Sequence, residues 1–142
     1  MPVIWNEALQ KRVWSQMEVS YPNEGGGFLL GEIQGKHVYL RNVIQIENVF
    51  TEAEQYHRYI MTPADFIRLE DEAEAQGLSL VGYYHSHPNA PAVPSRFDRD
   101  HAWPNFIYLI TSVVNGQAVH SRGWRLQADR SRFNEAMVKL QD

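Results

Sequence analysis

The residues best suited to chemistry form two short motifs, His85-x-His87-Pro88 and Ser95-x-x-Asp98. Residues two apart on a β-strand point to the same face, so a strand that ends at Pro88 presents both imidazoles to one point. Two imidazoles are a partial metal site, because a catalytic zinc takes three protein ligands from His, Asp or Glu. Asp98 is the candidate third ligand, since the proline-rich loop between the motifs is stiff and can return the chain to the histidines.

Both motifs also have structural interpretations. A lone His-x-His pair is a weak signal, and Ser95-x-x-Asp98 alone is the pattern of a helix capping box. A capping role for Ser95 and Asp98 is compatible with metal binding. The two motifs together are more specific than either one, and they favour a metal site at the rim of a sheet.

A hydrolytic metal site also needs a general base. The residues alone do not select this base from the 17 carboxylates of the chain. Glu24 is one candidate because it precedes Gly25-Gly26-Gly27, where the backbone can pass close to another element. Considered without further information, Glu24 is better explained as a surface side chain before a flexible turn.

Hydrophobic periodicity predicts the elements that position these motifs. The first helix is marked by an apolar stripe with a spacing of four, formed by Trp5, Leu9, Val13 and Met17. Helices are expected at about 6–19, 62–76 and 95–103. Strands are expected at 28–33, 37–50, 78–87, 106–114 and 118–126.

Three further expectations concern the connections and the C-terminus. Residues 51–57 are polar and are expected to form a loop. On the 78–87 strand, Val81 and Tyr83 should share the face of the histidines. A final helix is predicted from the spacing of Phe133, Ala136, Met137 and Leu140. The resulting fold class is α/β (α+β), a mixed β-sheet flanked by helices.

The composition limits the classes of function. A chain of 142 residues has about the size of one domain, so residues 1–142 are expected to form a single domain. It has no cysteine, which excludes a disulfide framework, a thiolate zinc site and a cysteine nucleophile. The formal net charge of −4 disfavours nucleic acid as a partner. No signal-peptide pattern or apolar stretch of about 18 residues is found, so we expect a cytoplasmic protein without a membrane partner.

The motifs resemble those of the JAMM (MPN+) family of metalloproteases. The family pattern is an upstream Glu, then His-x-His-Pro, then Ser and Asp after fixed intervals. This pattern is matched without a spacing error by Glu24, His85, His87, Ser95 and Asp98. The resemblance therefore makes Glu24 the favoured general base.

The resemblance extends well beyond the motifs. It covers roughly Ala8 to Leu126, and the segments 21–31 and 80–88 are similar to the family's conserved strands. One difference is Gly26, a position at which many small bacterial relatives carry Cys. This position is not a metal ligand in the family pattern, so the difference affects only the expected shape of the adjoining groove.

The resemblance implies a fold and a role for each residue. The expected fold is the JAMM/MPN fold, which is similar to the cytidine-deaminase-like architecture. His85, His87 and Asp98 would hold one Zn²⁺ per chain. Glu24 would accept a proton from the attacking water and pass it to the leaving amine. Ser95 would donate a hydrogen bond to the developing oxyanion.

The resemblance also implies a class of substrate. Compact prokaryotic members of the family act on ubiquitin-like sulfur carrier proteins and cut after the C-terminal Gly-Gly. We therefore expect a peptidase or isopeptidase that acts on such a carrier, and a homodimer is a further expectation. The alternative is a non-catalytic scaffold or binding module that holds zinc. That alternative is disfavoured because the chain keeps Glu24 and the three metal ligands, and a DNA-repair relative is disfavoured by the acidic charge.

Overall fold

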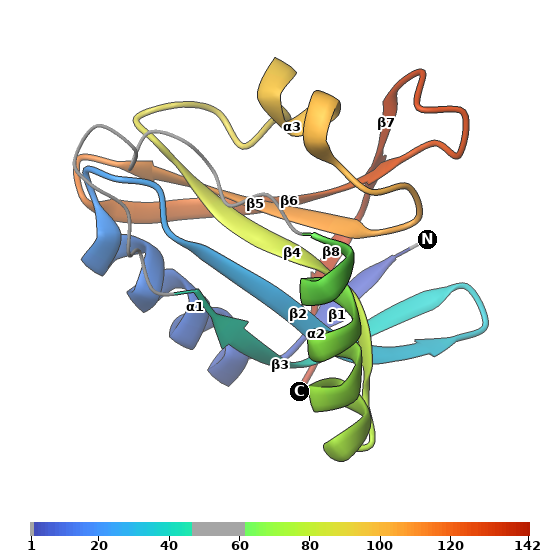
Figure 1. The fold of residues 1–142 in the computed structure, drawn as a ribbon. Helices are drawn as coiled ribbons and strands as arrows, with labels where there is room; N and C mark the ends of the chain where they lie inside the picture. Colours follow the sequence, from blue (N-terminus) through green and yellow to red (C-terminus); the bar gives the residue numbers. More distant parts are fainter. Residues whose placement is uncertain (1, 47–61) are drawn as a thin grey trace.

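The computed structural model describes residues 2–46 and 62–142, which form one mixed sheet with helices on both faces (Figure 1). The helices are α1 (Glu7–Ser20), α2 (Pro63–Ala75) and α3 (Arg96–His101). The strands are β1 (Val3–Trp5), β2 (Gly26–Gln34), β3 (His37–Gln45), β4 (Ser79–Pro88), β5 (Ile107–Val114), β6 (Gln117–Leu126), β7 (Phe133–Ala136) and β8 (Val138–Leu140). The predicted fold class is confirmed. The predicted loop at 51–57 and the end of the predicted strand 37–50 lie outside the described residues.

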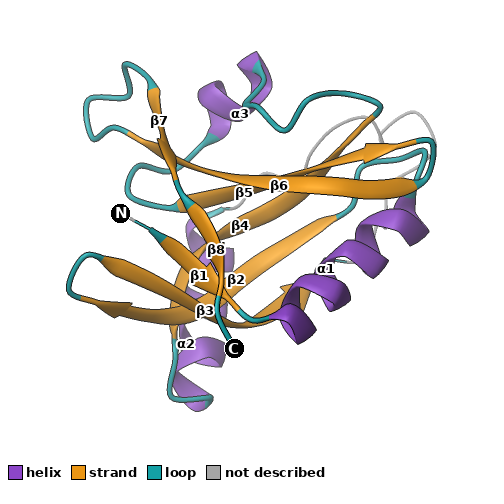
Figure 2. Cartoon of the chain, turned by 180° about the vertical axis from the view of Figure 1, so that it is seen from behind, coloured by secondary structure: helices purple, strands orange, loops and turns teal. Residues whose placement is uncertain are grey.

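The eight strands have the order β7-β6-β5-β4-β2-β3-β1-β8. β4 lies near the middle of the sheet, parallel to β5 and antiparallel to β2. Figures 1 and 2 show α1 against one face of this sheet, while α2 and α3 lie on the other face. None of the described helices is long and apolar enough to cross a membrane.

Two clusters of buried side chains hold these layers together. Leu9, Val13 and Met17 of α1 pack on one face of the sheet, as their spacing predicts. Leu69 and Ala73 of α2 pack on the other face. Burial of such apolar surface contributes about 25 cal/mol per Å². The central strands are therefore covered on both sides.

The ends of α1 and α2 are fixed by local chemistry. Asn6 caps α1 by accepting a hydrogen bond from the Leu9 N–H at 2.8 Å. Thr62 and Asp65 form a capping box at the start of α2, with Pro63 in the first turn. The chain leaves α2 at Gly77, whose φ of +71° lies in the left-handed region that glycine adopts at the lowest cost. The predicted helix at 62–76 is therefore confirmed.

The prediction of a final helix is wrong. Phe133–Ala136 pairs with β6, and Val138–Leu140 pairs with β1. Met137 and Leu140 are 62% and 54% exposed, so the spacing that suggested an apolar helical face does not mark a buried one. Pairing with two open sheet edges satisfies the backbone of this segment instead.

The strand β1 was not predicted from the sequence. Its residue Trp5 lies in this strand rather than on the first turn of α1, although the spacing of four placed it in the stripe of that helix. β1 pairs with β3 and β8 in parallel. Only three residues long, it is set by its two neighbours rather than by a pattern of its own.

Val81 also differs from its predicted position. The register of β2 against β4 shifts at Leu29/Leu30, where Leu29 pairs with Gly82 and Leu30 pairs with Leu80. Val81 is the extra residue of this β-bulge, and it packs in the cluster beneath α1, whereas Tyr83 packs in the opposite cluster. A bulge interrupts strict alternation along a strand.

Candidate metal centre

The carboxyl end of β4 brings two imidazoles together. His85 and His87 lie on the same face of the strand, with 3.2 Å between their Nε2 atoms. They are only 1% and 7% exposed. The prediction that both imidazoles meet at one point is confirmed.

The loop after β4 is held by side chains that hydrogen-bond three of its consecutive carbonyl groups. The Ala90 carbonyl accepts a hydrogen bond from Ser112 Oγ at 2.6 Å. The Pro91 carbonyl lies 2.9 Å from His87 Nδ1, and the Ala92 carbonyl accepts from Trp124 Nε1 at 3.0 Å. These partners come from β5, β4 and β6, so three strands fix the path of the loop.

The contact with Pro91 also sets the protonation pattern of the His87 ring. A carbonyl oxygen can only accept, so Nδ1 carries the proton and donates it. The lone pair of the neutral ring is then on Nε2, which faces His85 Nε2 and the Asp98 carboxylate. A hydrogen bond from the second ring nitrogen to a carbonyl is the usual way in which a ligating histidine is oriented.

Asp98 completes the cluster from the first turn of α3. Its Oδ1 lies 3.2 Å from His85 Nε2, and its Oδ2 lies 3.4 Å from His87 Nε2. Oδ2 also accepts a hydrogen bond from the Ser95 N–H at 2.7 Å, and Ser95 Oγ accepts from the Asp98 N–H at 3.1 Å. The capping box and the cluster therefore use the same carboxylate, which supports the prediction that capping is compatible with metal binding.

These three side chains could hold a metal ion. One ligand atom from each of His85, His87 and Asp98 lies within 4.8 Å of the others, and all three residues are buried. Two imidazole nitrogens and one carboxylate oxygen are a donor set typical of catalytic zinc, which leaves a fourth position open. The donor chemistry and its orientation therefore fit the predicted ion.

The chain segment that contains Glu24 runs alongside the same strand end. The Ser86 N–H donates to the Gly25 carbonyl at 3.0 Å, and the Gly25 N–H donates to Ser86 Oγ at 2.9 Å. Gly26 is the direct partner of His85 in the antiparallel register. The half-buried Glu24 directly precedes this contact, so its backbone lies near the same end of β4.

The glycines after Glu24 are required by close approach. A β-carbon on Gly26 would lie 2.7 Å from the Tyr84 carbonyl oxygen and 2.8 Å from the Tyr83 hydroxyl. A β-carbon on Gly27 would lie 2.6 Å from the Tyr84 hydroxyl and would also clash with the Ile44 carbonyl. The expectation that the glycines allow the backbone to pass close to another element is confirmed. The Tyr83 hydroxyl lies against Gly26, so a larger residue at position 26 would displace this side chain.

Sequence reasoning missed the residues that support the loop. Neither Ser112 nor Trp124 was singled out. The Trp124 ring also stacks under the guanidinium of Arg122, 4.8 Å from the ring centre. No local signal identifies these donors, because they lie 22 and 32 residues from the carbonyls that they bind.

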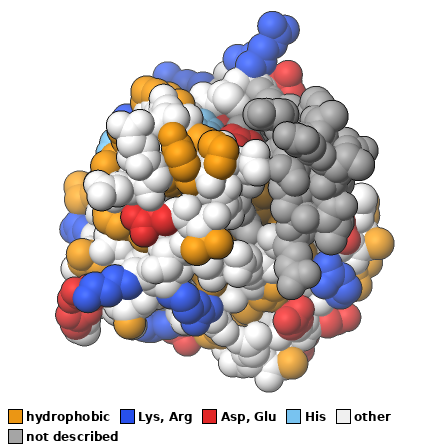
Figure 3. All heavy atoms as spheres, turned by 90° about the vertical axis from the view of Figure 1, so that its left-hand side faces the viewer, with side chains coloured by type: hydrophobic (Ala, Val, Ile, Leu, Met, Phe, Trp, Pro, Cys, Tyr) orange, Lys and Arg blue, Asp and Glu red, His pale blue; other side chains and the backbone are white. Residues whose placement is uncertain are grey.

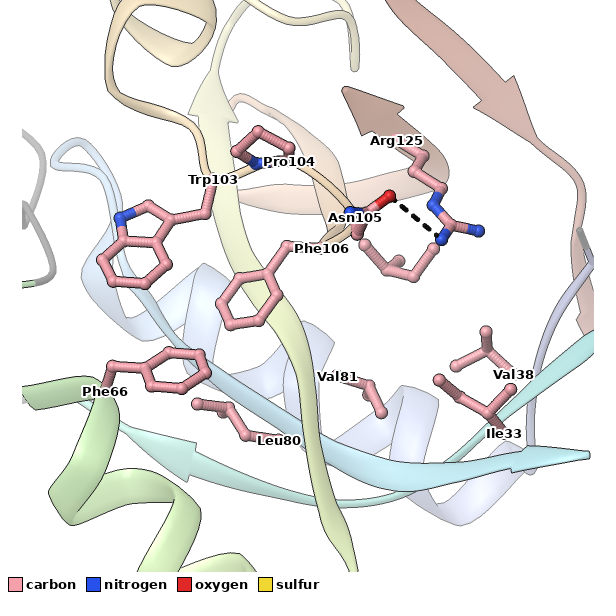
Figure 4. Close-up of a pocket in the computed structure, with 11 residues that line it drawn as sticks. Ile33, Val38, Phe66, Leu80, Val81, Trp103, Pro104, Asn105, Phe106 and Arg125 are labelled. Carbon is pink, nitrogen blue, oxygen red and sulfur yellow. Dashed lines mark hydrogen bonds between the residues drawn. The ribbon is translucent and has the colours of Figure 1, made fainter. Parts of the chain in front are cut away.

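Figure 3 views the molecule from the side toward which β4 runs in Figure 1. His and Asp or Glu side chains reach the surface there among hydrophobic ones. A separate cavity of about 270 Å³ lies near the start of β4, lined by Leu80, Val81 and the stacked rings of Phe66, Trp103 and Phe106 (Figure 4). It is therefore at the other end of the strand from the metal centre.

Comparison with known proteins assigns the chain to a family. The model of the family described as prokaryotic homologs of the JAB domain matches residues 6–127. The chain belongs to this family. The resemblance to JAMM proteins is thereby confirmed, and with it the enzyme class, a metallopeptidase of the JAMM type.

Individual relatives of this JAB-domain chain agree with the assignment. It is 34% identical over 100 residues to a desampylase from Haloferax volcanii, covering 70% of this chain and 69% of that protein. It is 33% identical over 89 residues to a probable TtuB-protein conjugate cleaving protease from Thermus thermophilus, covering 63% of this chain and 55% of that protein.

Solved structures show the same fold. A protein from Salinibacter ruber has a TM-score of 0.74 and 33% identity, covering 100% of this chain and 92% of that one. A protein from Desulfitobacterium hafniense has a TM-score of 0.80 with 22% identity, covering 99% of this chain and 93% of that one. The mixed sheet described above is therefore also the fold of these two solved structures.

Proposed function

We propose that this chain is a zinc-dependent peptidase that hydrolyses the bond after the C-terminal Gly-Gly of a ubiquitin-like sulfur carrier protein. The observation that carries this proposal is the buried cluster of His85, His87 and Asp98 at the end of β4, in a chain of the JAB-domain family.

His85, His87 and Asp98 would hold the zinc. When bound, the ion supplies a Lewis acid that polarises the scissile carbonyl and lowers the pKa of the attacking water. The hydrogen bond from His87 Nδ1 to Pro91 keeps the ligating nitrogen of that ring turned toward the cluster. The hydrogen bond from the Ser95 N–H likewise orients the Asp98 carboxylate toward the cluster.

Glu24 is the proposed general base. It would take a proton from the attacking water and deliver it to the nitrogen of the leaving amine. The register of Gly25 and Gly26 against β4 supports this role, because it directs residue 24 toward the His87 end of the strand. Proton transfer by a positioned side chain typically contributes about 10²–10⁴-fold to the rate.

Ser95 is the proposed donor to the oxyanion. Its Oγ accepts the hydrogen bond of the Asp98 N–H, and a hydroxyl can donate its own proton at the same time. The capping box therefore fixes the position of the hydroxyl beside the metal ligand. A donor held in place before the reaction stabilises charge that develops only in the transition state.

The substrate class is supported by the relatives and by chemistry. The Haloferax volcanii protein is named a desampylase, and the Thermus thermophilus protein is named for cleaving TtuB-protein conjugates. Gly-Gly is the tail that passes most easily through a narrow channel, because glycine has no side chain. A peptide bond and an isopeptide bond both present a carbonyl carbon to the same centre.

A cleavage assay read by intact mass tests this function. The substrate is a ubiquitin-like sulfur carrier with a short extension after its Gly-Gly, incubated with the zinc-loaded protein. We expect a loss of mass equal to the extension, and no loss in the presence of a chelator. An intact carrier after incubation with protein that holds one zinc would contradict the proposal and favour a scaffold that only retains the metal.

A further inference from the structure

An open pocket adjoins the metal centre on the side of α3 and β7, which lie side by side in Figures 1 and 2. Its volume is about 410 Å³, and it is lined by Pro94, Ser95, Arg96, Arg99 and Phe133. Ser95 belongs to both places, because it lines the pocket and exchanges hydrogen bonds with the metal ligand Asp98. The pocket therefore begins at the proposed oxyanion donor.

The two walls of the pocket are fixed by the chain itself. The guanidinium of Arg130 donates hydrogen bonds to the carbonyls of Ala102 and Arg99 at 2.6 and 3.0 Å, and so ties the turn before β7 to the end of α3. On the other wall, the Phe133 ring packs edge-on against Tyr108 with 5.9 Å between the ring centres. The pocket does not depend on a ligand for its shape.

The lining of the pocket is cationic and aromatic. Arg96 and Arg99 are three residues apart on α3, a spacing that makes them neighbours on a helix surface. Both are exposed, and neither guanidinium makes an ion pair within the part of the chain that the structure describes. Paired guanidinium groups bind carboxylates, and the nearby Phe133 ring suits an apolar group that carries one.

The chemistry of the substrate decides which side of the scissile bond this pocket receives. The carrier ends in Gly-Gly, and glycine has no side chain to occupy a pocket of about 410 Å³. Neither glycine needs such a pocket, so we assign it to the residues that leave. One or two residues in extended conformation reach about 3.5–7 Å, and a short extension also carries its own terminal carboxylate.

Building on the proposed function, we propose that Arg96 and Arg99 bind a carboxylate on the leaving side of the scissile bond. This makes them residues that determine specificity for extensions that end shortly after Gly-Gly or that carry an acidic side chain there. A lysine side chain linked through an isopeptide bond has no carboxylate at the equivalent distance.

Binding can be measured without turnover, on zinc-loaded Glu24→Gln protein whose peptides are confirmed as intact by mass. The probes are acetylated Ala-Gly-Gly-Ala-Phe with a free carboxylate, the same peptide as its C-terminal amide, and Ala-Gly-Gly-Ala-Glu amide. NMR titration follows the arginine Nε resonances. We expect the free carboxylate to bind about tenfold more tightly than the amide. Tight binding of the Glu peptide would add side-chain carboxylates to the class.

The matched variants are Arg96→Gln/Arg99→Gln and the control Arg68→Gln on α2. The double variant should bind the carboxylate and amide peptides equally, and the control should keep the tenfold preference. Equal affinities in Glu24→Gln protein with both arginines present, or an unchanged preference in the double variant, would overturn the inference. Cleavage by the protein with Glu24 intact is scored separately, so a failure of the peptidase function is distinguishable from a failure of this pocket.

Discussion

Two stretches of chain converge on the carboxyl end of β4, and they are held there in opposite ways. The stretch 88–98 is held by side chains of three strands that bond its consecutive carbonyls. The stretch 24–27 depends on close approach to its neighbours, since a β-carbon on Gly26 or Gly27 would meet backbone oxygens. Loss of a single hydrogen bond in the first stretch should therefore lower the stability only slightly. One added methyl group in the second stretch should lower it more.

Among the variants that compare the two stretches, Ser95→Ala at the end of the carbonyl-bonded stretch has the largest expected effect. Removing the donor should lower kcat about 10²–10³-fold, by analogy with other oxyanion donors. The zinc content should stay the same, because His85, His87 and Asp98 remain. Ser95→Thr keeps a hydroxyl and is the matched control. Turnover of Ser95→Ala at the level of the unmodified protein would remove Ser95 from the mechanism.

Gly27→Ala tests the glycine stretch. The added methyl group meets the Ile44 carbonyl and the Tyr84 hydroxyl, so the free energy of unfolding should fall by about 2–3 kcal/mol. Gly35→Ala in the turn between β2 and β3 is the control, with a φ of +61° and open space around it. Its cost should be about 1 kcal/mol. Denaturant unfolding measures both, and equal losses would show that close approach is not what holds this stretch.

Ser112→Ala removes one tie from the other stretch. The Ala90 carbonyl loses its hydrogen bond, which should cost about 1 kcal/mol of stability. Zinc should still bind, because His87 keeps its bond to Pro91 and Trp124 keeps its bond to Ala92. The measurement is denaturant unfolding together with metal analysis. A loss of stability as large as that of Gly27→Ala would show that the two stretches do not differ in this way.

The smallest expected effect on stability is that of the Arg122–Glu135 pair, which lies beside Trp124 and so supports the stretch 88–98 only indirectly. Arg122 stacks on Trp124 and bonds both carboxylate oxygens of Glu135, which lowers the pKa of Glu135. A carboxyl group with a lowered pKa in the folded state adds stability above its unfolded pKa of about 4.3 and loses it as the pH falls through the folded value.

Because the Arg122–Glu135 pair is exposed to solvent, its contribution should be below about 0.5 kcal/mol. Unfolding measured between about pH 5 and pH 3 should show a slightly steeper loss of stability for the unmodified protein than for Glu135→Gln. Identical pH profiles would show that the pair adds nothing to the support of Trp124.

The site could be predicted from the sequence because its signals are local. His85 and His87 need only the alternation of one strand, and Ser95 and Asp98 need only the first turn of one helix. Their meeting point required the loop between them, and its ties to Ser112 and Trp124 come from distant strands. No sequence pattern within the loop predicts that Ser112 and Trp124 are its hydrogen-bond donors.

The C-terminal segment shows the opposite situation. The spacing of Phe133, Ala136, Met137 and Leu140 fits a helix, yet the segment forms β7 and β8. Which structure forms there depends on the open edges of β6 and β1, which the spacing of apolar residues does not describe. The bulge at Val81 has the same cause, because the register is a property of a strand pair.

The most direct test of the central claim is zinc content and turnover measured on the same preparations of Glu24→Gln and His87→Ala. Turnover is read as the loss of the extension from a Gly-Gly carrier by intact mass. We predict that Glu24→Gln keeps one zinc and loses at least about 10²-fold in rate, whereas His87→Ala loses both. Near-normal turnover in Glu24→Gln, or normal zinc content in His87→Ala, would contradict the proposed roles.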